Sequence, residues 1–305
     1  MIYTMTLNPS IDYIVHVDDL EMGAVNRMNS DLKLPGGKGI NVSRILKRIH
    51  SDSVALGFLG GFTGNFIKDW LTQEQIRCQF TTVSDDTRIN IKLKSVQETE
   101  INGTGPSLTN EETQALKEAL STIQAGDIVV LSGSTPKSLR AGFYQELITI
   151  IKDKQAEFVI DTTGADLLAS LPANPILVKP NNHELADLYR TEFTSIHDIL
   201  PYGQKLLADG AQHAIISMAG DGALLFCKDG IYQSNVLKRE VKNSVGAGDS
   251  MIAGFIGHYA KTNDSVEAFK WGVACGSATA FSDDLATAAF IEELLPEVTI
   301  KKIEL

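Results

Sequence analysis

The chain has 305 residues, of which 43% are apolar and 21% are charged, the composition of a globular protein with one large or two medium domains. Its 38 acidic and 27 basic side chains give a net charge of −11, which argues against a general nucleic-acid surface and requires local Lys or Arg for any phosphorylated ligand. Three cysteines without a CxxC spacing argue against a disulfide framework or a zinc knuckle.

The first residues, MIYTMTLNPS, lack the basic start and the apolar core of a signal peptide. No stretch approaches the ~18 apolar residues of a membrane span. We therefore expect a cytoplasmic protein that binds neither nucleic acid nor membranes.

Short apolar runs alternate with amphipathic stretches along the chain. The runs predict strands at 2–7, 54–57, 127–131, 158–161, 176–178, 214–217 and 223–226. The amphipathic stretches predict helices at 41–49, 111–123, 141–151 and 199–208. Several runs are continuously apolar, as in strands buried on both faces of a parallel sheet. This alternation predicts a doubly wound, three-layer α/β/α fold with a mainly parallel central sheet.

Two segments depart from this pattern, because 13–17 and 89–96 alternate apolar and polar residues. Such alternation is typical of strands with one exposed face. We predict a single domain over residues 1–305, with a small β-sheet lid formed by roughly 11–35 and 88–107. Ordinary edge strands of the main sheet remain the alternative.

The segment NPSID, residues 8–12, directly follows the first predicted strand. Asp12 is therefore expected near the carboxyl end of that strand, where ligands bind in open α/β sheets. A carboxylate there could accept hydrogen bonds from two neighbouring sugar hydroxyls. The alternative is a turn or a cap.

The segment PGGKGIN, residues 35–41, contains three glycines that let a ligand approach the backbone closely. Lys38 could supply a point charge to a phosphate, and Asn41 could hydrogen-bond a sugar hydroxyl. The alternative is a plain loop before a helix.

The segment NSVGAGDS, residues 243–250, leads into a predicted helix at 251–259. Free N–H groups at a helix start make an anion site, and Gly246 and Gly248 give the tight turn that exposes them. Asp249 lies in the first turn, where it could accept the proton of an attacking hydroxyl or simply cap the helix. The positive end of the helix dipole is expected to lower the pKa of Asp249.

Several other catalytic motifs are absent from the sequence. There is no GxxxxGK[ST], no GxGxxG after the first strand, no HExxH and no GxSxG. The sequence therefore gives no support to a P-loop, dinucleotide-binding, zinc-protease or nucleophile-elbow enzyme.

The three segments together resemble the ribokinase-like (PfkB) family of carbohydrate kinases. GGKGIN is similar to the first family signature, and NSVGAGDSMIAG, residues 243–254, is similar to the second. The resemblance covers essentially the whole chain. TLNPSID and GGKGINVSRIL resemble the branch of 1-phosphofructokinases and tagatose-6-phosphate kinases.

The resemblance implies ATP-dependent phosphorylation of fructose 1-phosphate to fructose 1,6-bisphosphate. Two alternatives remain open: a tagatose-6-phosphate kinase that forms tagatose 1,6-bisphosphate, and a non-enzymatic sugar-phosphate sensor on a kinase-like fold. The resemblance also implies ATP as co-substrate, Mg²⁺ bridging its oxygens, and a homodimer formed through the lid.

The resemblance assigns roles to matching positions. Asp249 would be the base, with Gly246, Ala247 and Gly248 as the anion hole. The sugar would be held by Asp12, Gly37, Asn41 and Ser132, and its phosphate by Lys38 and Arg88, with Arg27 and Lys92 as weaker candidates. Lys92 and Arg27 could instead be surface residues.

On the nucleotide side, Lys179 and Asn181 would lie beside ATP, and SMAGDG would surround its ribose and phosphates. That loop comprises Ser217, Met218, Ala219, Gly220, Asp221 and Gly222, with Gly248 completing the ATP site. Glu184 of NNHE would act on the metal through water, or be a solvated first-turn residue. Asp161 would sit at a strand end facing the same crevice.

Overall fold

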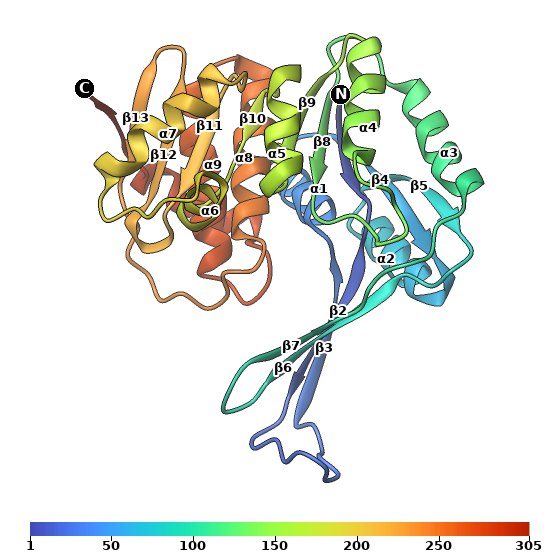
Figure 1. Ribbon diagram of the computed structural model, residues 1–305. Helices are drawn as coiled ribbons and strands as arrows, with labels where there is room; N and C mark the ends of the chain where they lie inside the picture. The colour runs from blue at the N-terminus through green and yellow to red at the C-terminus, as the bar shows by residue number, and fades with distance from the viewer. Residues whose placement is uncertain (305) are drawn as a thin grey trace.

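A ten-stranded sheet forms the centre of the computed structural model, which describes residues 1–304 (Figure 1). Its strands run in the order β14-β13-β12-β11-β10-β9-β8-β1-β4-β5. From β5 to β11 neighbouring strands are parallel, and from β11 to β14 they are antiparallel. The strands are β1 (Ile2–Thr6), β4 (Ser53–Gly60), β5 (Arg77–Val83), β8 (Ile128–Ser132), β9 (Glu157–Asp161), β10 (Leu177–Val178), β11 (Ala214–Ser217), β12 (Ala223–Cys227), β13 (Gly230–Ser234) and β14 (Ile300–Ile303).

Helices cover both faces of this sheet. One face carries α3 (Asn110–Ala119), α4 (Phe143–Asp153), α5 (Gly164–Ser170), α6 (Asn182–Tyr189) and α7 (Ile196–Ala208). The other carries α1 (Lys38–Arg48), α2 (Gly61–Gln73), α8 (Ala247–Thr262), α9 (Ser265–Ala280) and α10 (Ala288–Leu294). The fold predicted from the sequence, three α/β/α layers with a mainly parallel central sheet, is confirmed.

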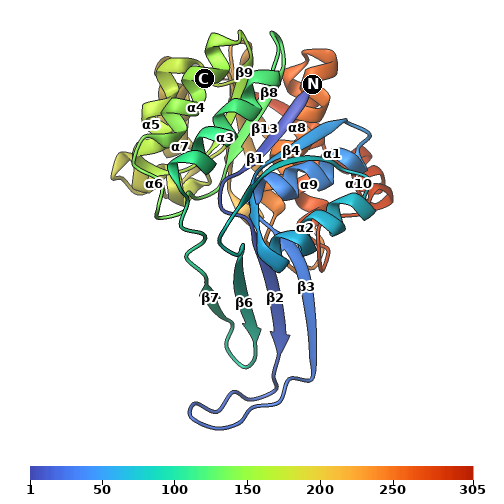
Figure 2. The same ribbon diagram turned by 90° about the vertical axis from the view of Figure 1, so that its right-hand side faces the viewer.

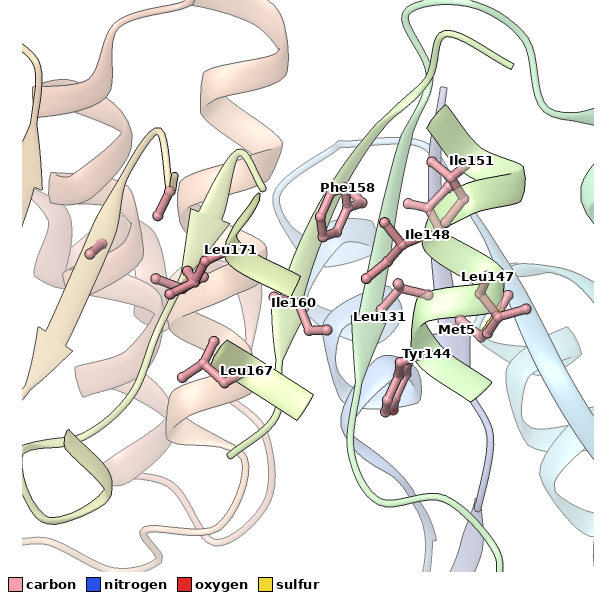
Figure 3. Close-up of a cluster of buried hydrophobic side chains, with 14 of the residues drawn as sticks. Met5, Leu131, Tyr144, Leu147, Ile148, Ile151, Phe158, Ile160, Leu167 and Leu171 are labelled. Atoms are coloured by element: carbon pink, nitrogen blue, oxygen red, sulfur yellow. The ribbon is translucent and has the colours of Figure 1, made fainter. Parts of the chain in front are cut away.

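Alternate residues of each central strand feed the two cores, because successive side chains of a strand point to opposite faces. In β8, Val129 and Leu131 join the core beneath α3 to α7, whereas Ile128 and Val130 join the one beneath α8 and α9. Figure 3 shows Leu131 packed with side chains of α4. Burial of each such Leu or Ile side chain contributes roughly 1.5–3 kcal/mol to the stability of the fold. The sheet is therefore a stable support for the residues at the carboxyl ends of its strands.

A second, four-stranded sheet projects from the carboxyl edge of the first (Figures 1 and 2). Its strands are β2 (Ser10–His16), β3 (Ser30–Gly36), β6 (Arg88–Lys94) and β7 (Thr99–Asn102), in the order β3-β2-β6-β7. β2 pairs antiparallel with β3 and parallel with β6. The two alternating segments of the sequence therefore lie side by side in one sheet, apart from the ten-stranded one.

Several elements were not predicted. The helix α9 is buried on most sides, so its sequence shows no polar stripe from which a helical period could be recognised. The strand β3 was missed for the opposite reason, because its first four residues are all exposed and form no apolar run. The apolar run of β12 suggested a parallel strand, but β12 pairs antiparallel with both neighbours.

Of the helices in residues 1–304, none combines the length and apolar character that a membrane span requires.

Candidate active site

A cleft of about 1350 Å³ opens at the carboxyl edge of the central sheet. Strand ends meet there, because the last residues of neighbouring parallel strands share one edge. Thr6, Ser132, Asp161 and Ser217 end β1, β8, β9 and β11, and all four line the cleft. The N-terminal ends of α1 and α8 line the same space.

The helix α8 begins at a glycine turn without a side-chain cap. Gly246 is its N-cap, with φ of 79°, a left-handed conformation that favours glycine. No side chain caps this end, so the first-turn N–H groups of Gly248 and Asp249 have no capping partner. The turn can therefore bind an anion in the cleft.

Asp249 is buried in the first turn of α8 and faces the cleft. Its Oδ2 accepts a hydrogen bond from Asn41 Nδ2 at 2.9 Å. Burial, reinforced by the negative charge of Asp161, raises the pKa of Asp249 to about 6, against the opposing effects of Lys38, Asn41 and Lys179. The lowered pKa expected from the sequence is wrong, because loss of hydration outweighs the helix dipole. Asp249 is thus a stronger base than its position in the helix suggested.

Lys38, the first residue of α1, forms an ion pair across the cleft. Its Nζ lies 2.8 Å from Asp161 Oδ2. Burial lowers the pKa of Lys38, but the charges of Asp161, Asp249 and Glu184 outweigh this effect and the pKa is raised. Lys38 is thus held as an ammonium among carboxylates, close to the Asp249 end of the cleft.

Lys179 is a buried cation beside the glycine turn. It is 7% exposed, and a Cβ added at Gly248 would lie 2.9 Å from its Nζ. Within residues 1–304 no carboxylate forms an ion pair with it. A buried ammonium without a counter-ion is costly, so an anion bound at the turn would supply its missing partner.

The second sheet supplies a polar wall of the cleft. Asn90 Nδ2 donates to Ser10 Oγ at 3.0 Å and to Asp12 Oδ1 at 3.2 Å, and this fixes the Asp12 carboxylate. The Arg88 guanidinium donates to the carbonyl oxygens of Asn8 and Gly103. Because only neutral oxygens hold it, Arg88 keeps its charge available for an anionic group in the cleft.

Three buried oxygens in this region, Thr6 Oγ1, Asn8 Oδ1 and Ser132 Oγ, have no hydrogen-bond partner. All three residues line the cleft. The oxygens themselves have almost no solvent-accessible surface, so they lie behind the lining of the cleft rather than on it.

On the opposite side, Asn181 and Glu184 form the capping box of α6. The Asn181 side chain accepts from Glu184 N, and Glu184 Oε2 accepts from Asn181 N, both at 2.8 Å. Both residues also line the cleft. Glu184 therefore has the first-turn role that the sequence left open, and only its other carboxylate oxygen remains for a ligand.

Most residues singled out from the sequence meet in this cleft, but four do not line it. Met218 is buried in the core beneath the helices, and Asp221 is exposed on the 217–222 loop and does not line the cleft. Lys92 lies 3.6 Å from Glu100 and 3.9 Å from Asp12, and Arg27 is on the exposed outer loop of the second sheet. The other predicted site residues line the cleft.

Sequence reasoning missed several lining residues. Asn90 gave a signal, since it lies two residues after Arg88 on the same strand and so shares its face. The segment 235–241, together with Ser277 and Phe281, carries no recognisable motif. Only the three-dimensional structure brings these residues together.

Comparisons with known proteins agree on one family. The model of the pfkB family carbohydrate kinases matches residues 5–289. The chain is 52% identical to the 1-phosphofructokinase of Bacillus subtilis, over 99% of this chain and 100% of the relative. It is 35% identical to the D-tagatose-1-phosphate kinase of Bacillus licheniformis, over 98% and 99%. The crystal structure of Escherichia coli phosphofructokinase-2 with substrates and products superposes with a TM-score of 0.92, at 28% identity over 97% of this chain and 98% of that one.

Proposed function

We propose that this chain, which belongs to the pfkB family of carbohydrate kinases, phosphorylates fructose 1-phosphate to fructose 1,6-bisphosphate. The observation that carries the proposal is Asp249, a buried carboxylate beside an uncapped helix start in the main cleft. The relative named 1-phosphofructokinase is 52% identical, and this identity favours fructose 1-phosphate as the acceptor.

In the proposed reaction, the oxygen of a sugar hydroxyl bonds to the γ-phosphorus of ATP. Asp249 takes the proton of that hydroxyl as the bond forms. The bond between that phosphorus and the bridging oxygen breaks, and ADP leaves. The N–H groups of Gly246 and Gly248 stabilise the charge on the moving phosphoryl group. The Ala247 N–H, predicted to share this role, donates to the carbonyl oxygen of Ser244 at 3.3 Å. A pKa of about 6 suits Asp249 to this role, since it is ionised at neutral pH yet basic enough to take a proton.

ATP is the co-substrate that the family implies, and Lys179 fits its phosphates as a buried cation without a carboxylate partner. Among residues 1–304, no group of three or more His, Cys, Asp and Glu side chains is placed to hold a metal ion. A Mg²⁺ ion is proposed to be held mainly by phosphate oxygens and water, with Glu184, which lines the cleft, acting through water. Such an ion would neutralise charge on the triphosphate.

The sugar is proposed to lie between the two sheets. Asp12, Asn41, Ser132 and the backbone of Gly37 would hold its hydroxyls, and Arg88 would bind the phosphate that it already carries. Lys38, predicted to share that phosphate, lies instead beside Asp161. We propose that Lys38 also stabilises the negative charge on the phosphoryl group during its transfer.

An ADP-release assay tests the proposal with fructose 1-phosphate, fructose 6-phosphate, tagatose 1-phosphate, tagatose 6-phosphate and unphosphorylated fructose side by side. We expect the highest kcat/KM with fructose 1-phosphate. The variant Arg88→Ala should lose most of that preference over unphosphorylated fructose. A higher kcat/KM with either tagatose phosphate would reassign the substrate, and no ADP release with any sugar would favour a sensor.

The pH dependence of kcat/KM should report Asp249 in the free enzyme. Below pH ~6 we expect kcat/KM to fall about tenfold per pH unit, as the carboxylate is protonated. Replacing Asp161 with Asn removes a charge that raises this pKa, so the acid limb should move to lower pH. The substrate phosphate titrates equally in assays of the wild type and of Asp161→Asn. The difference between the two pH profiles therefore reports only the enzyme's own groups. A limb that does not move would contradict the role of Asp249.

The second sheet is proposed to act as a lid and as the contact in a cytoplasmic homodimer. It exposes large apolar side chains on one face, among them Ile89 and Ile101, at 40% and 59%. Such a surface is typical of an interface. In sedimentation, Ile101→Lys should be monomeric, whereas Leu168→Lys, at an exposed apolar position on α5, should behave as the wild type. A fully active wild-type monomer at micromolar concentration would contradict the proposal.

A further inference from the structure

Arg44 is a charged side chain almost completely buried in the middle of α1. It is 2% exposed. Its Nε and Nη2 donate to the carboxylate of Glu74, at 3.0–3.1 Å. Nη1 and Nη2 donate to the carboxylate of Asp284, at 3.3 and 2.8 Å. One guanidinium thus joins α1 to the end of α2 and to the loop after α9.

The loop held by Arg44 is also held by Arg48, one turn further along α1. Arg48 Nη1 donates to the carbonyl oxygens of Leu285 and Ala286, at 2.6 and 2.7 Å. We refer to Arg44 and Arg48 with Asp284 as the arginine clamp. A segment with little regular structure is therefore fixed to a helix by four charge-assisted hydrogen bonds.

This loop supports the glycine turn of α8 from behind. Leu285 is packed so closely that a Cβ added at Gly246 would lie 2.7 Å from its Cδ2. A hydrogen-bonded chain runs in parallel: Ala286 N donates to Thr279 Oγ1, which lies 2.8 Å from Ser250 Oγ. Ser250 Oγ in turn donates to Gly246 O at 2.7 Å. Movement of the loop would therefore move the turn.

The other end of α1 touches Asp249 itself, through Asn41 Nδ2. One helix thus orients the base at its start and holds the loop behind the anion turn at its middle. Buried ion pairs add little net stability compared with apolar residues of the same size. Fixed geometry is therefore a better reason for a buried guanidinium with two carboxylates than stability is.

We propose that Arg44, acting through Asp284, is a positioning residue that keeps the 246–248 turn aligned with Asp249. The proposal rests on the proposed function, since it takes this turn as the site of phosphoryl transfer. A displacement of ~1 Å at a catalytic group can cost ~10²-fold in rate. The loss should appear in kcat, because neither Arg44 nor Asp284 reaches the cleft.

The test compares two matched variants of the full-length protein, Asp284→Asn and Glu74→Gln. Each removes one carboxylate charge from Arg44. Glu74 also lies 3.7 Å from Arg48 Nη2, but only Asp284 lies on the loop behind the turn. We expect Asp284→Asn to lower kcat about tenfold or more with little change in either KM. Glu74→Gln should lower Tm by a similar amount and leave kcat unchanged. Asp283→Asn, next to Asp284 but 88% exposed, should change neither.

Hydrogen exchange of the amides at 246–249 gives a readout that does not need activity. Exchange there should be faster in Asp284→Asn than in Glu74→Gln. Equal kcat losses in both variants, or unchanged kcat and exchange in Asp284→Asn, would overturn the proposal. If the wild-type protein had no kinase activity but the two variants showed the expected exchange difference, only the proposed function would be refuted. The structural role of the arginine clamp would still be supported.

Discussion

Asp249→Asn should lower kcat by at least ~10²–10⁴-fold, the usual contribution of a general base, while the KM for ATP changes little. An Asn side chain keeps the shape and can still accept the hydrogen bond from Asn41, but it cannot take a proton. A coupled ADP-release assay measures the loss. Near-normal kcat in the variant would refute the assignment of Asp249 as the base.

The same substitution should make the protein more stable above pH 6. The pKa of Asp249 is raised from 3.8 to about 6 in the fold, so the native state binds this proton more tightly than the unfolded state does. Stability therefore falls as pH rises through this range, by up to about 3 kcal/mol. Asn carries no such penalty. The gain in Tm over the wild type should be largest at pH 8 and smallest at pH 4, and a lower Tm at pH 8 would contradict the burial argument.

Gly246→Ala should lower kcat by ~10²-fold, the cost of disturbing an oxyanion-type hole. Its φ of 79° strains any residue with a Cβ, and the new methyl group would meet Leu285 at 2.7 Å. The turn must then shift, and with it the N–H groups that face the cleft. Steady-state kinetics with ATP and the phosphosugar measure the effect.

Gly142→Ala is the matched control. Gly142 is also an N-cap in the left-handed region, with φ of 83°, but it starts α4 and does not line the cleft. The nearest atom to an added Cβ there is 3.7 Å away, so the backbone strain occurs without a clash. The two variants should lose stability from the same backbone strain, but only Gly246→Ala should lose catalysis. Equal kcat values in the two variants would contradict the role of the 246–248 turn.

The fold was predictable where local pattern and tertiary environment agree. Strands such as β8 and β9 are continuous apolar runs because both of their faces are covered, and this signal is local. The helix α9 gave no signal because its neighbours, not a periodic polar face, make it helical. Pairing direction was also invisible, since the run of β12 does not show whether its neighbours are parallel.

The site was predictable to the extent that its residues lie in short motifs. Lys38, Asn41 and Asp249 come from two segments about 200 residues apart that meet in one cleft. The pKa of Asp249 was predicted with the wrong sign, because burial and the proximity of Asp161 are tertiary properties. The arginine clamp was equally hidden, since Asp284 lies in no motif and is 240 positions away from Arg44.

The division of the cleft between two sheets has a consequence for selectivity. Asp12 and Arg88 belong to the second sheet, whereas Asp249 and Lys179 belong to elements around the first. With Arg88 as the proposed phosphate site and Asp249 as the proposed base, a ketose phosphate must be long enough to reach from one sheet to the other. We expect a three- or four-carbon analogue to dock at Arg88 yet leave its terminal oxygen short of the base. The length of the carbon chain would then discriminate between substrates more strongly than the configuration at any single carbon.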